Sequence, residues 1–350
     1  MKRYIFGLLA AILAMQPVTV YGENPMPGQI SQLQKSAEKG DANAQLSLGV
    51  MYAIGQGVRQ DYVEAARLFQ LAALQGNPTA QCSLGIMYYH GQGVRQDYVE
   101  AVRWYRMAAE QGDALAQLNL GVAYDTGQGV TQDYAEAVNW YCLAAEQGNG
   151  LAPALAQYNL GTAFAKGHGV SQDYTEALLW FRLAAEQGNA KAQCSLGFIY
   201  ETGQGERQDY AEAARWYRKA ADQGDALAQY HLGSLYATGQ GVGKDDAEAL
   251  RWYRLAAGQG QVKAQCTLGF MYYNGQGVKQ DYAEAARWYR QAADQGNGAA
   301  SALAQYNLGS MYAAGQGVSR DMQQARTLFG KACQNGMQPA CDACQKLKEK

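Results

Sequence analysis

The sequence predicts an all-α fold built from about eight helix–turn–helix repeats. Three observations lead to this class: a loop motif that recurs at nearly constant spacing, apolar patterns of helical period on both sides of the loop, and helix start and stop signals at matching positions. A fixed period in this range is typical of a solenoid, because one unit alone cannot bury its apolar face. We expect the eight repeats to occupy residues 41–336.

The recurring loop is a GQGV-like tetrapeptide. The stretch GQGVRQDYVEA at 55–65 is repeated letter for letter at 91–101. Each first glycine is expected to end a helix, since glycine adopts the left-handed conformation after a helix at little cost. These loops follow one another after 36 or 40 residues and start at Gly55, Gly91, Gly127, Gly167, Gly203, Gly239, Gly275 and Gly315.

Each repeat is expected to contain two antiparallel helices, which we name helix A and helix B. Helix A precedes the loop, and in the first repeat Ala44, Leu48 and Tyr52 fall on one helical face. Helix B follows the loop and starts at an aspartate with Glu or Gln three residues later. This spacing predicts a capping box in which each cap contributes about 1 kcal/mol. The capping aspartates are Asp61, Asp97, Asp133, Asp173, Asp209, Asp245, Asp281 and Asp321.

One position of helix B carries the six tryptophans of the chain. The first and last repeats have Leu68 and Leu328 at that position. We interpret the tryptophans as core anchors, with smaller anchors in the terminal repeats. A row of rings that stacks ligands is the alternative. The six residues are Trp104, Trp140, Trp180, Trp216, Trp252 and Trp288.

Two four-residue insertions interrupt the period. GLAP at 150–153 precedes helix A of the fourth repeat, and GAAS at 298–301 precedes helix A of the eighth. The insertions are four repeats apart, which indicates duplication of a four-repeat block. Four residues are about one helical turn, so each insertion lengthens either a helix or an edge loop.

The repeat pattern resembles a known family. The pattern A-x-x-x-L-G-x-x-Y-x-x-G-x-G-V-x-x-D-x-x-E-A-x-x-W-Y-x-x-A-A-x-x-G is similar to that of the Sel1-like repeats, relatives of the tetratricopeptide repeats, and it covers residues 27–350. The resemblance implies a right-handed αα-solenoid whose members mostly act as adaptors and scaffolds in protein assemblies. We expect an N-terminal capping half-repeat at 23–40 and a C-terminal capping helix at 337–350.

The first residues are typical of an export signal. Lys2 and Arg3 precede the apolar run at 4–15, and small side chains follow near Gly22. We expect residues 1–22 to be removed and the mature protein to be soluble, monomeric, and periplasmic or secreted; an uncleaved anchor is the alternative. The formal net charge of −2 gives no electrostatic footprint for nucleic acid.

Two of the seven cysteines are predicted to form a disulfide. Cys333 and Cys341 flank a tight turn near the C-terminus, and exported proteins retain such bonds. The pair also resembles the bridge of the cysteine-rich branch of the family. A redox or metal pair at Cys341-x-x-Cys344 is the alternative. We expect the remaining cysteines to be free: Cys82, Cys142, Cys194, Cys266 and Cys344.

No catalytic constellation stands out in the sequence. The three histidines have no zinc-ligand spacing, so we expect no metal and no cofactor. Ser36-x-x-Lys39 matches the nucleophile motif of serine β-lactamases, but the partner motifs S-D-N and K-T-G are missing. Resemblance to the cysteine-rich branch nevertheless keeps weak penicillin binding or β-lactam hydrolysis open as an alternative function.

The predicted partner site lies on helix A. Positions opposite the core face of helix A are rich in aromatic residues, and in related repeat folds this helix lines the concave surface. We expect these side chains to bind a protein or peptide. Wedging between successive A helices is the alternative. The residues are Ile86, Tyr89, Tyr158, Phe198, Tyr230, Phe270, Tyr273 and Tyr306.

Overall fold

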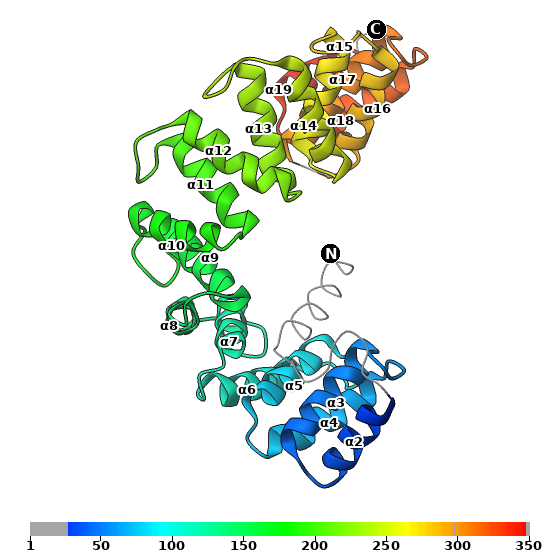
Figure 1. Cartoon of the computed structure of the whole chain (residues 1–350). Helices are drawn as coiled ribbons and strands as arrows, with labels where there is room; N and C mark the ends of the chain where they lie inside the picture. Colours follow the sequence, from blue (N-terminus) through cyan, green and yellow to red (C-terminus); the bar gives the residue numbers. More distant parts are fainter. Residues whose placement is uncertain (1–26, 297, 348–350) are drawn as a thin grey trace. The chain divides into compact units, whose positions relative to one another are not determined.

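The computed structural model describes residues 27–296 and 298–347, and the regular structure in those ranges is entirely α-helical (Figure 1). The predicted signal at 1–22 lies outside the described residues. A first helix, α2 (Pro27–Glu38), precedes the repeats, and a last one, α19 (Gln338–Lys346), follows them. The all-α solenoid prediction is therefore confirmed.

Helices A and B alternate along the chain as the sequence predicts. The A helices are α3 (Ala42–Ile54), α5 (Pro78–His90), α7 (Ala114–Thr126), α9 (Leu151–Lys166), α11 (Ala190–Thr202), α13 (Ala226–Thr238), α15 (Val262–Asn274) and α17 (Ala299–Ala314). The B helices are α4 (Tyr62–Leu74), α6 (Tyr98–Ala109), α8 (Tyr134–Ala145), α10 (Tyr174–Glu186), α12 (Tyr210–Asp222), α14 (Asp246–Gly258), α16 (Tyr282–Ala293) and α18 (Met322–Gln334).

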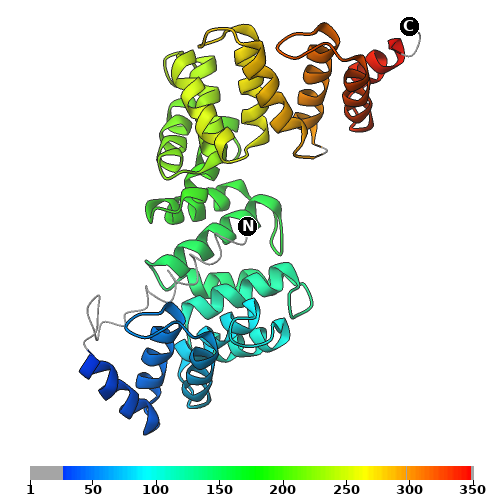
Figure 2. The ribbon, with the colours of Figure 1, turned by 90° about the vertical axis from the view of Figure 1, so that its right-hand side faces the viewer.

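The chain divides into two compact units, which meet in sequence between the fourth and fifth repeats. The first unit runs to Gln187 and the second starts at Gly188. Within each unit, consecutive helices lie side by side as antiparallel pairs (Figure 2). Both insertions lengthen a helix, since α9 and α17 have 16 residues where α3 has 13. Each unit therefore ends its set of four A helices with a longer one.

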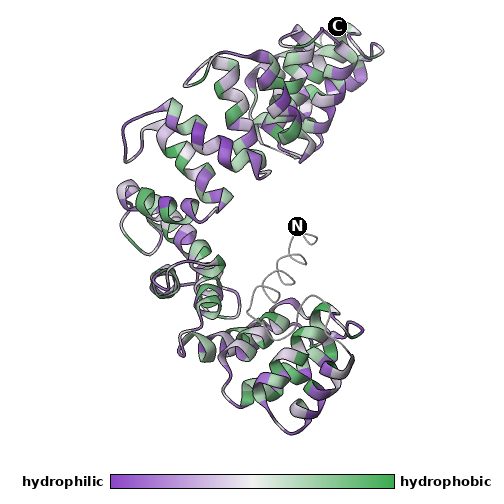
Figure 3. Cartoon of the chain, viewed as in Figure 1, coloured by the Kyte–Doolittle hydropathy of each residue, from purple (hydrophilic) through white to green (hydrophobic). Residues whose placement is uncertain are grey.

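The core is built from alanines and rings. Polar and apolar positions are interleaved along the helices (Figure 3), and the small buried residues let neighbouring helices approach closely. Ala65 and Phe69 are completely buried in the first repeat. The tryptophans pack as core anchors, because Trp104, Trp216, Trp252 and Trp288 are buried and the other two are half-buried.

The two glycines of the GQGV loop have different structural roles. Gly91 ends α5 with φ of +68°, as expected, and its N–H donates to the Met87 carbonyl. Gly93 also has φ of +68°, but a Cβ there would lie only 1.9 Å from the carbonyl oxygen of Tyr62. Tyr62 belongs to the preceding repeat. The second glycine is therefore required by contact between repeats as well as by the turn.

Only half of the predicted capping box forms. The Asp61 carboxylate accepts hydrogen bonds from the Val63 and Glu64 N–H groups at 2.9 and 3.1 Å, as expected. The Asp61 N–H, however, donates to the Tyr52 carbonyl at 2.9 Å instead of to Glu64. Glu64 pairs with Arg67 on the surface. The backbone N–H that a capping box would pair with Glu64 therefore donates to a carbonyl near the end of helix A.

A buried glutamine of helix A links three helices. The Gln81 side chain is 1% exposed. Its Nε2 donates to the Ala73 carbonyl of the preceding helix B at 3.1 Å, and its Oε1 accepts from Gln111, after its own helix B, at 2.7 Å. We name this arrangement the glutamine clamp. It recurs within the units at Gln45, Gln117, Gln157, Gln229, Gln265 and Gln305.

Replacement of Gln229 by leucine should lower the free energy of unfolding by about 1–3 kcal/mol, because the Ala221 carbonyl and the Gln259 amide lose their buried partner. Urea denaturation followed by circular dichroism measures the change. Gln291→Leu is the control, since Gln291 is exposed on helix B where other repeats carry leucine. Equal stability of the two variants would contradict a structural role for the clamp.

Alanine at Gly129 should destabilise the protein more than alanine at Gly112. Both glycines have positive φ, +76° and +87°, so both variants bear the cost of a left-handed alanine. Only at Gly129 would the new Cβ meet a neighbouring repeat, 2.1 Å from the Tyr98 oxygen. We expect an additional loss of about 1–3 kcal/mol in unfolding free energy, measured by urea denaturation. Similar losses for both variants would disprove the proposed contact.

Candidate partner-binding surface

Two predicted partner-binding residues expose about half of a large apolar residue to solvent. Phe198 on α11 is 44% exposed, and Phe270 on α15 is 52% exposed. They hold the same position of helix A, directly after the Leu-Gly pair. Both residues belong to the second unit. This position is therefore an accessible apolar site in the fifth and seventh repeats.

Three predicted tyrosines stand four residues earlier in helix A, directly after its buried glutamine, and are half-buried. Each ring packs at a tilted angle against an aromatic ring of helix B in the same repeat, so only part of the tyrosine faces solvent. The ring centroids are 5.8 Å apart for Tyr158 and Phe181, 5.7 Å for Tyr230 and Tyr253, and 5.6 Å for Tyr306 and Phe329.

The other three predicted residues take part in packing between repeats. The Tyr89 hydroxyl donates to Gln128, in the loop of the next repeat. The Tyr273 hydroxyl donates to Gln316 in the same way, at 2.9 Å. Ile86 is 4% exposed and belongs to the core of the first unit. For Ile86, the structure has the wedged arrangement that the sequence left open as an alternative.

A polar cluster that the sequence analysis missed lies beside Phe198. Glu201 accepts a hydrogen bond from the Tyr217 hydroxyl at 2.5 Å, and the Nδ1 atom of His231 lies 3.1 Å from the same oxygen. The His231 ring stacks on Tyr217 with centroids 5.0 Å apart and meets Phe198 edge-on at 6.4 Å. Three helices contribute these residues, so no short motif marks the cluster.

The hydrogen bonds of this cluster affect the acidity of its carboxyl group. Burial alone raises the pKa of Glu201, but the hydrogen bonds from His231 and Tyr217 outweigh burial and leave the pKa below its ordinary value. Glu201 is therefore ionised at neutral pH and its oxygens already have donors. Its role is to hold His231, and through it one side of Phe198, in place.

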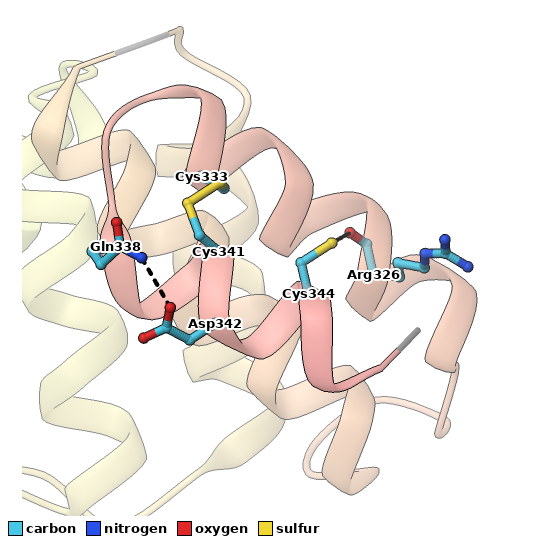
Figure 4. The surroundings of a disulfide bond; sticks show 6 residues. All are labelled: Arg326, Cys333, Gln338, Cys341, Asp342 and Cys344. Carbon is cyan, nitrogen blue, oxygen red and sulfur yellow. Dashed lines mark hydrogen bonds between the residues drawn. A yellow bond between two sulfur atoms is a disulfide. The ribbon is translucent and has the colours of Figure 1, made fainter. Parts of the chain in front are cut away.

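The predicted disulfide is present at the C-terminus. Cys333 in the last turn of α18 is bonded to Cys341 in the first turn of α19, with Cα atoms 4.7 Å apart (Figure 4). Cys341 is therefore not available for a redox or metal pair with Cys344. The Cys344 side chain is half-buried, with its Sγ 3.9 Å from the Arg326 carbonyl oxygen (Figure 4).

The other free cysteines show no sign of reactivity. Cys82, Cys194 and Cys266 are buried in the cores, and Cys142 is half-buried. Burial raises the pKa of the Cys266 thiol to about 11, and it raises the pKa values of the other three as well. These thiols therefore stay protonated at neutral pH, the form in which a thiol is a poor nucleophile.

The Ser36-x-x-Lys39 motif lies at the C-terminal end of α2 and in the turn that follows it. Ser36, in the last turn of α2, donates to the Asp41 carboxylate at 3.3 Å, and Asp41 in turn caps α3. This contact gives Ser36 a structural role at the join of two helices.

Over the described ranges, no three His, Cys, Asp or Glu side chains are grouped as for a metal ion. No helix in those ranges is long and apolar enough to cross a membrane.

The stacked antiparallel pairs define the class of an αα-repeat protein that presents side chains of helix A. Comparison with family models identifies the repeat itself. The Sel1 repeat model matches residues 42–77, 78–113, 114–149, 154–189, 190–225, 226–261, 262–297 and 302–337. The chain belongs to the Sel1 repeat family, whose members typically act as protein-interaction scaffolds.

Solved structures include similar proteins. A Sel1 repeat protein from Oxalobacter formigenes is 35% identical over 91% of this chain and 90% of its own, with a TM-score of 0.68. A protective antigen of uropathogenic Escherichia coli strains, described as displaying an SLR fold, is 33% identical over 98% of this chain and 90% of its own, with a TM-score of 0.42. Comparison with curated proteins gives no match.

Proposed function

We propose that this Sel1 repeat protein is an interaction scaffold whose helix-A surface binds a peptide or protein segment. The exposure of Phe198 and Phe270 carries this proposal. Serines occupy the same position in the sixth and eighth repeats, at Ser234 and Ser310, so the repeat does not need a large apolar side chain there to fold. Aromatic side chains are enriched at protein interfaces, where they fill pockets of the partner.

The surroundings of the two phenylalanines suit a partner segment with apolar anchors and some polar groups. The half-buried rings of Tyr230 and Tyr273 extend the apolar area on α13 and α15. The Lys263 ammonium lies 6.0 Å from the centre of the Tyr230 ring and leaves a positive charge at the edge. Such an apolar centre with a polar rim is the usual composition of a binding surface.

Changing Phe198 and Phe270 together to alanine should weaken binding to a protein partner at least about tenfold, because truncation of an aromatic anchor typically costs more than 1 kcal/mol. The measurement is quantitative capture from an envelope extract by the immobilised protein, followed by titration of the captured partner. Leu255→Ala is the control, because Leu255 is equally exposed but lies on helix B.

Circular dichroism of both variants should match that of the wild type, since neither change touches a buried side chain. If the double phenylalanine variant captures the same partner with unchanged affinity, the helix-A surface is not the binding site. Loss of binding in Leu255→Ala alone would instead point to the helix-B face.

We further propose that the protein works outside the cytoplasm. The signal-like residues at 1–22 support export, and the Cys333–Cys341 disulfide suits an oxidising compartment. The intact mass of the protein from the envelope fraction of its own source should correspond to cleavage near Gly22. Alkylation of the denatured protein should add two more groups after reduction of that disulfide than before it, because the other cysteines are free in both cases. A full-length, cytoplasmic product would contradict the proposal.

A further inference from the structure

One arrangement of charges and a ring recurs on helix B. In the seventh repeat, the Nε atom of Arg287 donates to the Glu284 carboxylate at 2.9 Å, and the guanidinium lies over the Trp288 ring, 4.4 Å from its centre. We name this arrangement the Glu-Arg-Trp triplet. The same residue types hold the same positions in three other repeats, as Glu100, Arg103 and Trp104, as Glu212, Arg215 and Trp216, and as Glu248, Arg251 and Trp252.

The arginine is missing from the third and fourth repeats, where Asn139 and Leu179 stand in its place. The glutamates of these repeats, Glu136 and Glu176, are exposed, whereas the five glutamates that pair with an arginine are half-buried. No ion pair joins Glu136 or Glu176 to another described residue. The two repeats therefore present carboxylates for which the chain supplies no arginine.

The tryptophans of these two repeats are also less covered. Trp140 and Trp180 are half-buried, while the four tryptophans that follow an arginine are buried. Among the described side chains, no Lys or Arg lies over either ring. Leu143 and Leu183, one turn further along, are each 46% exposed. Residues four and seven apart share a helical face, so carboxylate, ring and leucine form one stripe on α8 and another on α10.

The charge of the surrounding chain suits a cationic partner. Residues 114–189, which form the third and fourth repeats, contain seven Asp and Glu but only two Lys and Arg, a net charge of −5. The rest of the chain contains 24 acidic and 27 basic residues, a net charge of +3. The negative charge is therefore concentrated around the two incomplete triplets, and both of these lie in the first unit, on α8 and α10 (Figure 1).

We propose that α8 and α10 bind a protein segment that carries arginine, with one guanidinium at each incomplete triplet, against the unpaired carboxylate and over the half-buried ring. Apolar side chains of the segment pack on the two exposed leucines. Arginine suits this place better than lysine, because its planar group pairs with a carboxylate and also stacks on an aromatic ring. The chain itself uses arginine in every complete triplet. This surface is separate from the proposed partner surface on helix A of the second unit.

The first test is a fluorescence anisotropy titration of labelled hexa-arginine with the protein in about 150 mM salt, which screens long-range attraction. Hexa-arginine should bind with a Kd at or below about 100 µM. Hexa-lysine has the same charge and should bind at least about fivefold more weakly. Absence of hexa-arginine binding, or equal binding of the two peptides, would overturn the proposal.

Restoring the missing arginines tests the location. Asn139→Arg with Leu179→Arg should complete both triplets from within the chain, so that hexa-arginine binds at least about tenfold more weakly and the melting temperature does not fall. Thr131→Arg with Ser171→Arg is the matched control, because it adds the same charge at exposed loop positions where the first two repeats carry arginine. The control should weaken binding by no more than about twofold. Equal weakening in both variants would show an effect of charge alone and contradict the proposal.

Removing the carboxylates is the converse test. Glu136→Gln with Glu176→Gln should weaken hexa-arginine binding at least about tenfold. Glu146→Gln with Glu186→Gln removes the same charge from the C-terminal ends of α8 and α10 and should change binding by less than about twofold. Retained binding in the first of these variants would rule out the two incomplete triplets as the site.

Sedimentation velocity of the protein alone tests the other possible occupant, a second copy of the chain. We expect a monomer, with the two triplets open to a partner segment. Self-association that disappears when the two arginines are restored would assign this face to a second copy and overturn the proposal.

Discussion

The buried glutamine amide of helix A is the interaction on which the rest of the structure depends. Because it lies among alanines, both its N–H and its C=O must be paired, and the partners belong to two different B helices. A shift of one repeat along its neighbour would break the bond from Gln81 to the Ala73 carbonyl, whereas the bond from Gln111 lies within the repeat. The glycine at Gly93 acts from the other end of the repeat, where it permits close approach to Tyr62. Together, these contacts set the spacing of successive repeats from two sides.

The features that sequence could predict are those decided within one repeat. Glycine ends, aspartate caps, the lengthened helices and the disulfide all depend on residues close in the chain. The predictions fail where another helix determines the burial of a side chain or the partner of a hydrogen bond. Ile86 and Phe198 hold the same helix-A position, yet Ile86 is buried and Phe198 is exposed, a difference that the pattern of helix A alone does not predict. The capping-box spacing pairs the Asp61 N–H with Glu64, whereas the folded chain brings the Tyr52 carbonyl of helix A to that N–H.

The two units show how a repeat scaffold separates folding from function. Positions that recur in every repeat form the glutamine clamp, the helix caps and the loop contacts. A few other positions in each repeat take no part in these contacts. A phenylalanine or a serine after the Leu-Gly pair is compatible with the same backbone. Small exchanges at such positions change the side chains that the surface presents without altering the fold.

The disulfide makes the two ends of the repeat array differ in how their terminal helices are held. At the N-terminal end, α2 is held by the buried apolar side chains of Leu33 and Ala37. At the other end, the nine-residue α19 has no side-chain cap, and Ala340 is its only fully buried residue within the described range. A reductant would therefore loosen the C-terminal end first. A protease that attacks a loosened α19 would act faster in a reducing compartment, so the lifetime of the protein would depend on where it resides.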